Sequence, residues 1–234
     1  VEFLRALFER TYVRDIVERY SLKNKEILDE LLDIMASSVG GLTNATKLAN
    51  TFKSVKRETV SRNTLANYLD YICESFLMER AQRYDIKGKR YIDSPFKYYF
   101  ADCGLRNARL NFRQVEYAHL LENVIYNELI ARGFNVDVGV VQKMARQDEG
   151  VRERQYLEVD FVCNQGSKRY YIQSAYRMVD EAKVKQEEAS LRNIDDSFKK
   201  IIILGEYTPV LHNEAGITTI SIYDFLLKDN SLEL

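Results

Sequence analysis

The stretch SRNTLANYLDYICESFLMERAQRYDIKGKRYI, residues 61–92, decides the fold of the first half of the chain because two patterns meet in it. Ser61 is a typical N-cap, and apolar residues follow it at helical spacing, which predicts a helix over 62–75. Residues 77–84 then alternate between two faces, and a glycine-containing turn at 85–90 leads into a second short strand. We therefore expect a helix followed by a β-hairpin.

Three further helices are expected upstream, over residues 2–20, 25–39 and 43–52. The glycine pair at 40–41 is expected to end the second of these helices, and Thr43 or Asn44 to cap the third. Short helices, a longer helix and a basic hairpin, in that order, indicate a winged helix-turn-helix. We assign this module to residues 1–110.

Strands alternate with helices in the second half, residues 111–234, which indicates a mixed α/β sheet. The expected strands are 135–141, 156–163, 169–176, 200–205 and 216–222, and the expected helices are 115–132, 180–193 and a final turn at 223–228. The short apolar run KIIILG at 200–205 is typical of a buried central strand. Residues 142–154 are polar and charged and are expected to form a loop. The fold class is thus α/β, α+β overall.

The charge of the chain is unevenly distributed. Residues 1–110 contain 19 Lys and Arg against 15 Asp and Glu, a net charge of +4, and residues 111–234 contain 15 against 20, a net charge of −5. This asymmetry places any contact with double-stranded DNA in the first half. The candidate DNA-binding residues are Lys47, Lys53, Lys56, Arg57 and Arg62 before and within the fourth helix, and Lys87, Lys89 and Arg90 in the hairpin.

Composition excludes several classes. No apolar run reaches about 18 residues, so no membrane partner is expected. Three widely spaced cysteines, an odd number without a CxxC pair, favour a reducing compartment, and we expect a cytoplasmic protein without a zinc site. The chain does not begin with Met and starts inside an expected helix, so we expect it to be part of a longer protein.

Three residues of the second half fall where a nuclease pattern would place them. Glu122 lies on an expected helix, Asp160 on one strand and Gln173 on the next. In the pattern written PD-(D/E)xK, such carboxylates bind magnesium, which activates water, and the lysine assists. Here Gln173 replaces the acid and Ala175 replaces the lysine. The catalytic set is therefore incomplete.

Three interpretations of this pattern stay open. Glu158 and Asp160, weak candidates for metal ligands, alternate on one strand, and polar alternation on a half-exposed strand explains them with nothing bound. The pattern also fits a non-catalytic remnant of a nuclease site. In the third interpretation the nuclease is active and uses displaced groups such as Glu187 or Lys185. Magnesium is expected as a cofactor only in that case.

Several strings, in order along the chain, resemble the uncharacterised domain that follows the ATPase module in many prokaryotic AAA-type ATPases. They are YVRDIVERY (12–20), TLANYL (64–69), RYDIKGKR (83–90), KYYFADCGLRN (97–107), LENVIYNELIARG (121–133), EVDFV (158–162), YIQ (171–173) and DFLL (224–227). The resemblance implies a winged-helix segment plus a restriction-endonuclease-like domain, and it implies that Gln173 is a family trait. It supplies no reaction.

ATP is not expected to bind this chain. No GxxxxGK[ST] phosphate-binding loop occurs, and Gly88–Lys89 is followed by Arg90 within a hairpin turn. The resemblance implies that ATP binds only in an N-terminal module outside this sequence, and that module is then a partner of the chain.

Three functions follow from these observations. The first is a DNA-binding module with an incomplete nuclease fold. The second is a protein-interaction or regulatory domain of the ATPase, for which the pairs Tyr98–Tyr99 and Tyr170–Tyr171 would be interface anchors. The alternative interpretation is that these tyrosines are core or sheet residues, which is the more common case. The third is an active metal-dependent endonuclease. The oligomeric state does not follow from the sequence.

Overall fold

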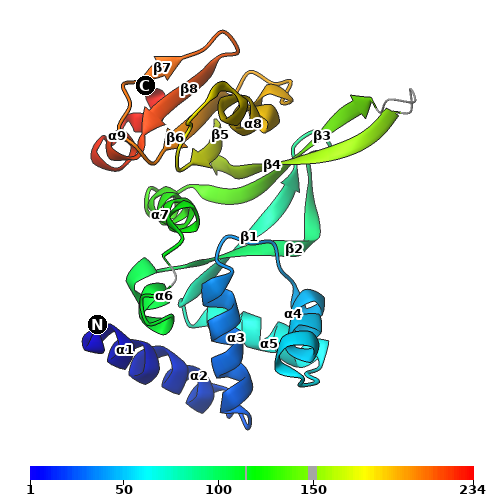
Figure 1. Cartoon of the computed structure of the whole chain (residues 1–234), viewed down its shortest axis with the longest axis vertical. Coiled ribbons are helices and arrows are strands. Elements are labelled where there is room, and N and C mark those ends of the chain that lie inside the picture. Colours follow the sequence, from blue (N-terminus) through cyan, green and yellow to red (C-terminus); the bar gives the residue numbers. More distant parts are fainter. Residues whose placement is uncertain (114, 147–151) are drawn as a thin grey trace. The chain divides into compact units, whose positions relative to one another are not determined.

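The computed structural model describes residues 1–113, 115–146 and 152–234 (Figure 1). The architecture is mixed α/β, with N-terminal helices followed by an eight-stranded mixed sheet with interspersed helices. Contacts divide the chain into two compact units. The first comprises Val1–Ala81 with Ser94–Asn123, and the second comprises Gln82–Asp93 with Val124–Leu234. The predicted domain boundary between residues 110 and 111 stays a prediction.

Except for α6, the helices of the first unit lie at the places where the sequence predicts them. Its helices are α1 (Glu2–Leu7), α2 (Arg14–Arg19), α3 (Lys25–Ser37), α4 (Ala45–Thr51), α5 (Arg62–Glu74) and α6 (Cys103–Arg109). Wider π-helical turns at Phe8–Val13 and Phe52–Lys56 join α1 to α2 and extend α4. The helix expected over 2–20 is therefore helical throughout.

N-caps fix where these helices begin. Asn44 is the cap of α4, because its side chain accepts a hydrogen bond from the Lys47 backbone N–H at 2.8 Å. The Ser61 hydroxyl accepts one from Thr64 at 3.0 Å and caps α5, as expected. Helix α6 was not predicted. It begins at Asp102, whose carboxylate accepts a hydrogen bond from the backbone N–H of Leu105 at 2.9 Å.

One apolar core holds the first unit together. Leu28, Leu31 and Leu32 of α3 are fully buried with Leu65 of α5 and Phe52. Burying a side chain of this size stabilises the fold by about 1.5–3 kcal/mol. The helices therefore present their outer faces, and not these residues, to solvent.

The sheet has the strand order β2-β1-β3-β4-β5-β6-β8-β7. Its strands are β1 (Met78–Asp85), β2 (Arg90–Phe100), β3 (Asn135–Arg146), β4 (Arg152–Gln165), β5 (Lys168–Ala175), β6 (Lys199–Leu204), β7 (Leu211–His212) and β8 (Ile217–Ser221). Parallel pairs are β1 with β3, β5 with β6 and β6 with β8, and β3, β4 and β5 pair antiparallel, as do β7 and β8. The predicted mixed sheet is confirmed.

Strand β6 is the buried central strand that the run 200–205 predicts. Its residues Ile201–Leu204 are buried, and it pairs with β5 on one side and β8 on the other. Helix α8 (Glu181–Arg192) packs against β4, β5 and β6, and α9 (Ile222–Leu227) packs against β6 and β8 (Figure 1). The remaining helical segments are α7 (Tyr117–Ala131) and a 3₁₀ turn at Ser231–Glu233.

The loop expected over 142–154 is wrong for most of its length. Strand β3 continues to Arg146, β4 begins at Arg152, and the two pair through this region, with Gln142 opposite Tyr156. Residues 147–151 lie outside the described part of the chain. In that described part, no helix is both long enough and apolar enough to cross a membrane.

Candidate functional site

The turn between α4 and α5 is built around a reversal of the backbone at Arg57. Arg57 has φ of +57°, in the left-handed region, and the backbone N–H of Glu58 donates to the carbonyl oxygen of Phe52 at 3.2 Å. Val60 is buried beneath the turn, and Ser61 then starts α5. The chain is thereby redirected between two helices that pack on one core.

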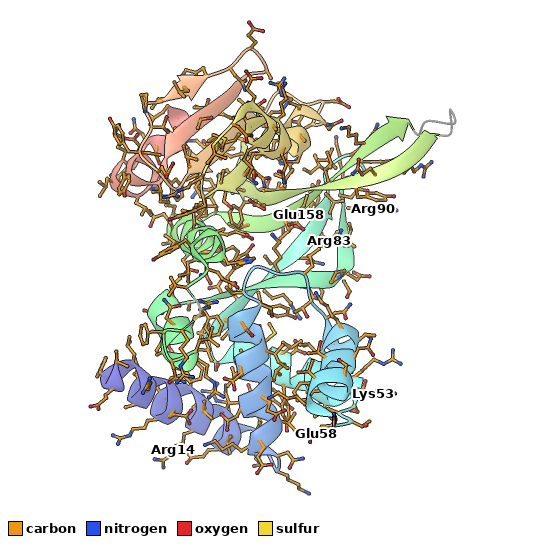
Figure 2. All side chains as sticks on the ribbon, in the orientation of Figure 1. Arg14, Lys53, Glu58, Arg83, Arg90 and Glu158 are labelled. Carbon is orange, nitrogen blue, oxygen red and sulfur yellow. The ribbon has the colours of Figure 1, made fainter. Side chains whose placement is uncertain are left out.

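Three of the predicted DNA-binding residues lie exposed around this turn. Lys53, Arg57 and Arg62 are exposed, and within the described residues none of them forms an ion pair. Figure 2 labels Lys53 together with Glu58, the acidic side chain within this segment. We call Lys53, Arg57 and Arg62 the turn cations. Their charge is available to an anionic partner.

The outer face of α5 carries polar side chains that the sequence did not single out. Asn63 and Asn67 are exposed and lie one helical turn apart, and Arg62 immediately precedes Asn63 in the first turn of α5. Asp70 lies further along the helix and forms an ion pair with Arg80 at 3.1 Å. The N-terminal half of α5 therefore carries a cation and two side-chain amides. Asp70, further along the helix, is neutralised by its ion pair with Arg80.

Lys47 and Lys56 differ from the turn cations. The Lys47 ammonium donates to the carbonyl oxygen of Leu42 at 2.8 Å. Lys56 lies 3.4 Å from the Glu30 carboxylate, which partly neutralises it. Both side chains were predicted to contact DNA, and both already have partners in the first unit.

The hairpin residues belong to the second unit. Lys87 and Lys89 are exposed at the turn between β1 and β2, and Lys89 has φ of +50°. The Asp85 carboxylate accepts a hydrogen bond from the Gly88 N–H at 2.9 Å and lies 3.6 Å from Arg90. Gly88 therefore stands in a hairpin turn, where no phosphate-binding loop can form.

Asp160 of β4 is buried and already hydrogen-bonded. Its Oδ2 atom accepts hydrogen bonds from both the backbone N–H and the hydroxyl of Ser174, each at 2.8 Å. The β3–β4 register shifts between Asp137 and Gly139, so that Val138 faces two residues of β4, Asp160 and Phe161. The expectation of a half-exposed strand is therefore wrong at Asp160, which retains 7% of its exposed surface.

Gln173 lies beside Asp160 on β5, but it brings no charge. Its side-chain oxygen accepts a hydrogen bond from the Asp160 backbone N–H at 3.4 Å and from the Ser190 hydroxyl of α8 at 3.3 Å. Ala175 is buried in the apolar core. The structure thus brings together Asp160, Gln173 and Ser174, and the sequence had not singled out Ser174.

Glu122 takes part in a buried network of the first unit. Its Oε1 atom accepts hydrogen bonds from the Lys97 ammonium at 2.8 Å and the Tyr99 hydroxyl at 2.6 Å. Lys97 retains 4% of its surface and Glu122 retains 9%. Lys97 contributes to the net positive charge counted over residues 1–110. It lies in a buried ion pair and adds nothing to a cationic surface.

The groups considered as displaced catalytic residues have partners on α8. Glu187 lies 2.5 Å from the Lys183 ammonium, and Lys185 lies 3.7 Å from Glu181. Glu158 lies opposite Val140 in the β3–β4 register. Among the residues that the structure describes, no three His, Cys, Asp or Glu side chains are placed to hold a metal ion. The groups near Asp160, an amide and a hydroxyl, add no negative charge to its carboxylate.

The tyrosine pairs are core residues. Tyr98 and Tyr99 retain 3% and 0% of their surface, and Tyr170 and Tyr171 retain 5% and 0%. The Tyr171 hydroxyl donates to Asp196 at 2.5 Å. The interpretation as core or sheet residues is therefore confirmed, and the alternative use as interface anchors is wrong.

Comparison with known proteins finds relatives whose descriptions name no activity. Residues 1–116 match the model of a family described as a domain of unknown function, DUF8612. An uncharacterized protein of Haemophilus influenzae is 32% identical over 225 residues, which are 96% of this chain and 52% of that protein. Uncharacterized protein MJ1544 of Methanocaldococcus jannaschii is 27% identical over 233 residues, which are 100% of this chain and 48% of that protein.

Among solved structures, protein VC1899 from Vibrio cholerae aligns with a TM-score of 0.32 and 14% identity, over 89% of this chain and 54% of that one. The chain spans about half the length of the curated relatives that it matches, and the family model matches its first 116 residues.

Proposed function

We propose that this chain is a DNA-binding module, in which α3, α4 and α5 of the first unit form a helix-turn-helix and α5 is the recognition helix. The observation that supports this most is the group of turn cations, which lie exposed and form no ion pair in the described part of the chain. A recognition helix meets the major groove with its N-terminal residues. Arg62 and Asn63 occupy that end of α5.

The residue types on this face suit DNA. Arg pairs with guanine and Asn with adenine through two hydrogen bonds each, so Arg62, Asn63 and Asn67 are the residues proposed to contact base edges. Lys53 and Arg57 are proposed to contact phosphates, which adds to affinity but not to sequence specificity. Ser61 caps the helix, so that the positive end of its dipole also faces the partner.

The second unit is proposed to be a restriction-endonuclease-like domain that does not cut DNA. Asp160 accepts two hydrogen bonds from Ser174, and the neighbouring positions hold Gln173 and Ala175 in place of an acid and a lysine. An uncharged amide does not bind magnesium as a carboxylate does, and alanine has no group that holds or activates water. A remnant of a nuclease site accounts for this arrangement.

The ATPase connection is also part of the proposal. The chain resembles the portion that follows an AAA-type ATPase module, and its curated relatives are about twice its length. In this view, a separate module of a longer protein binds ATP and the present chain supplies DNA contacts.

The test is fluorescence anisotropy with a labelled DNA duplex of about two helical turns, in buffer with magnesium. The wild-type chain is compared with the triple variant Lys53→Gln, Arg57→Gln, Arg62→Gln. A matched control removes the same charge from α1, α2 and the turn between them: Arg5→Gln, Arg10→Gln, Arg14→Gln, all exposed residues of the first unit (Figure 2 labels Arg14).

The proposal expects binding by the wild type and the control, much weaker binding by the triple variant, and intact DNA on a denaturing gel. No binding by the wild type near physiological salt contradicts the DNA proposal and leaves a protein-interaction domain. Cleaved DNA contradicts the incomplete-nuclease proposal and identifies an active endonuclease.

A further inference from the structure

A concavity of about 440 Å³ lies on the sheet of the second unit, over β1, β2, β3 and β4. Arg83, Arg90 and Arg154 line it together with Asp85, and Val140 and Tyr156 complete the lining used below. Strand register explains the grouping. Asp85 pairs with Val140 across β1 and β3, and Tyr156 pairs with Gln142 across β3 and β4, so that side chains from adjacent strands meet over one face.

The arginines that line this concavity have guanidinium donors available to a ligand. The Nε atom of Arg83 is buried and has no hydrogen-bond partner in the described part of the chain. A buried donor without a partner costs about 1–3 kcal/mol, so a ligand that accepts from it gains that amount. Arg154 is exposed and forms no ion pair with the described residues, and Arg90 has one contact of 3.6 Å with Asp85.

Acidic side chains do not cancel this charge. The Asp85 carboxylate is already held by the Gly88 N–H and lies beside Arg90. Glu158 does not line the concavity but lies opposite Val140 on β4 and is counted here as a second carboxylate; Figure 2 labels it with Arg83 and Arg90 in the second unit. Three guanidinium groups against two carboxylates leave the face positive. An anion, and not a cation, is therefore the ligand that this face would attract.

We propose that this concavity binds a nucleotide, with the phosphate held by Arg83 and Arg154 and the base stacked on Tyr156. The planar fork of arginine matches phosphate oxygens, which makes arginine the common residue for phosphate recognition. Tyr156 retains 63% of its surface, so its ring is free to stack on a base. Val140, which is 5% exposed, gives the concavity an apolar floor.

The stacking contact selects the kind of ligand. The bases of a duplex are stacked on one another and do not present a face to Tyr156, whereas a single strand and a free nucleotide do. The ligand chemistry, a phosphate joined to an exposed base, is the same in both sources. This site belongs to the second unit and does not depend on the turn cations, which belong to the first.

The experiment uses two probes: fluorescein-labelled oligothymidine of about 12 nucleotides, followed by anisotropy, and AMP, followed by calorimetry. All titrations use the full chain with Lys53, Arg57 and Arg62 replaced by Gln, which removes the proposed duplex contacts. The variants are Arg154→Gln, Tyr156→Ala and Arg83→Gln. The control is Arg177→Gln, an exposed arginine of the same unit that does not line the concavity.

We expect Arg154→Gln to weaken binding about tenfold and Tyr156→Ala at least fivefold, with the control within about twofold of the parent. Circular dichroism checks folding. Arg154 and Tyr156 are exposed, so their variants keep the test valid if Arg83→Gln unfolds. Binding of AMP points to a free nucleotide, and binding of the oligomer alone points to a strand.

Three results overturn the proposal: neither probe binds at about 1 mM, the variants bind as the control does, or an oligoglutamate peptide binds more tightly than both probes. Duplex binding by the wild type is measured separately, so that a failure of this site is distinguishable from a failure of the helix-turn-helix proposal.

Discussion

Replacement of Glu122 by Gln is expected to destabilise the first unit by about 3–5 kcal/mol, because it leaves the buried Lys97 ammonium without its carboxylate. The two side chains retain 9% and 4% of their surface, and their charged atoms are 2.8 Å apart. Gln keeps an oxygen that accepts from the Tyr99 hydroxyl, so the perturbation is mainly the loss of charge.

The magnitude follows from this geometry. At 2.8 Å and an effective dielectric constant of about 20, two unit charges attract by about 6 kcal/mol. Part of that attraction offsets the cost of removing both ions from water, so the net value of the pair is smaller than the cost of breaking it. A loss of about 3–5 kcal/mol is large against a typical domain stability of about 5–15 kcal/mol.

Urea denaturation followed by far-UV circular dichroism measures the change. Glu122→Gln, Lys97→Met and the double variant form a cycle, and we expect the double variant to be at least about 2 kcal/mol more stable than the sum of the single losses predicts. The control is Glu18→Gln, which breaks the fully exposed Arg14–Glu18 pair and should leave the midpoint unchanged.

A loss below about 1 kcal/mol for Glu122→Gln, with effects that add in the double variant, would refute the structural role assigned to this pair. Glu122 would then be a carboxylate that the fold does not need, and a catalytic or metal-binding use of it would have to be reconsidered.

Gly40→Ala should lower the free energy of unfolding by more than about 1 kcal/mol, because Gly40 has φ of +72° and a Cβ there would lie 3.2 Å from a Glu122 oxygen; urea midpoints equal to wild type would contradict this. Ser61→Ala should cost about 1 kcal/mol through loss of the α5 cap, measured by thermal unfolding, and an unchanged Tm would speak against it. Burial raises the pKa of the Cys73 and Cys103 thiols to about 11, so both stay protonated below that pH. Iodoacetamide should therefore alkylate them about a hundredfold more slowly at pH 8 in native protein than in urea, and equal rates would show that the thiols are exposed.

Local signals predicted most of the helices correctly. Ser61 and Asn44 cap the helices that follow them, and Gly133, with φ of +82°, follows the end of α7. Each of these signals depends on the backbone within a few residues, which a sequence states directly. Strand β6 was also predicted correctly, because a strand that is buried on both faces is a continuous apolar run without alternating polar residues.

The pairing of strands that are distant in sequence could not be predicted in the same way. The ends of β3 and β4 are polar, as in the contact of Gln142 with Tyr156, and they are strands because they pair with one another. Polar residues between two strands are more typical of a loop, so the sequence predicted one. Helix α6 was missed because its start depends on the Asp102 cap in a segment that contains Gly104, a poor helix former.

The same difference between local and long-range features applies to the candidate sites. The sequence showed that Gln173 replaces an acid, but the hydrogen bonds from Ser174 to Asp160 depend on the register of β4 and β5 and on the bulge beside it. Likewise, the charge count of residues 1–110 includes Lys97, and the sequence does not show that Lys97 is paired with Glu122, which lies 25 residues away. Exposure of a charged residue is a property of the fold, and charge counts along the chain cannot supply it.

The most direct test of DNA binding through α5 is the salt dependence of the binding constant for duplex DNA. If Lys53, Arg57 and Arg62 each neutralise one phosphate, they account for a slope of about −2.7 in log K against log salt, or about fortyfold weaker binding between 50 and 200 mM salt. Replacing all three by Gln should flatten the slope by that amount, while the Arg5, Arg10, Arg14 control keeps it. An unchanged slope in the triple variant would contradict the account.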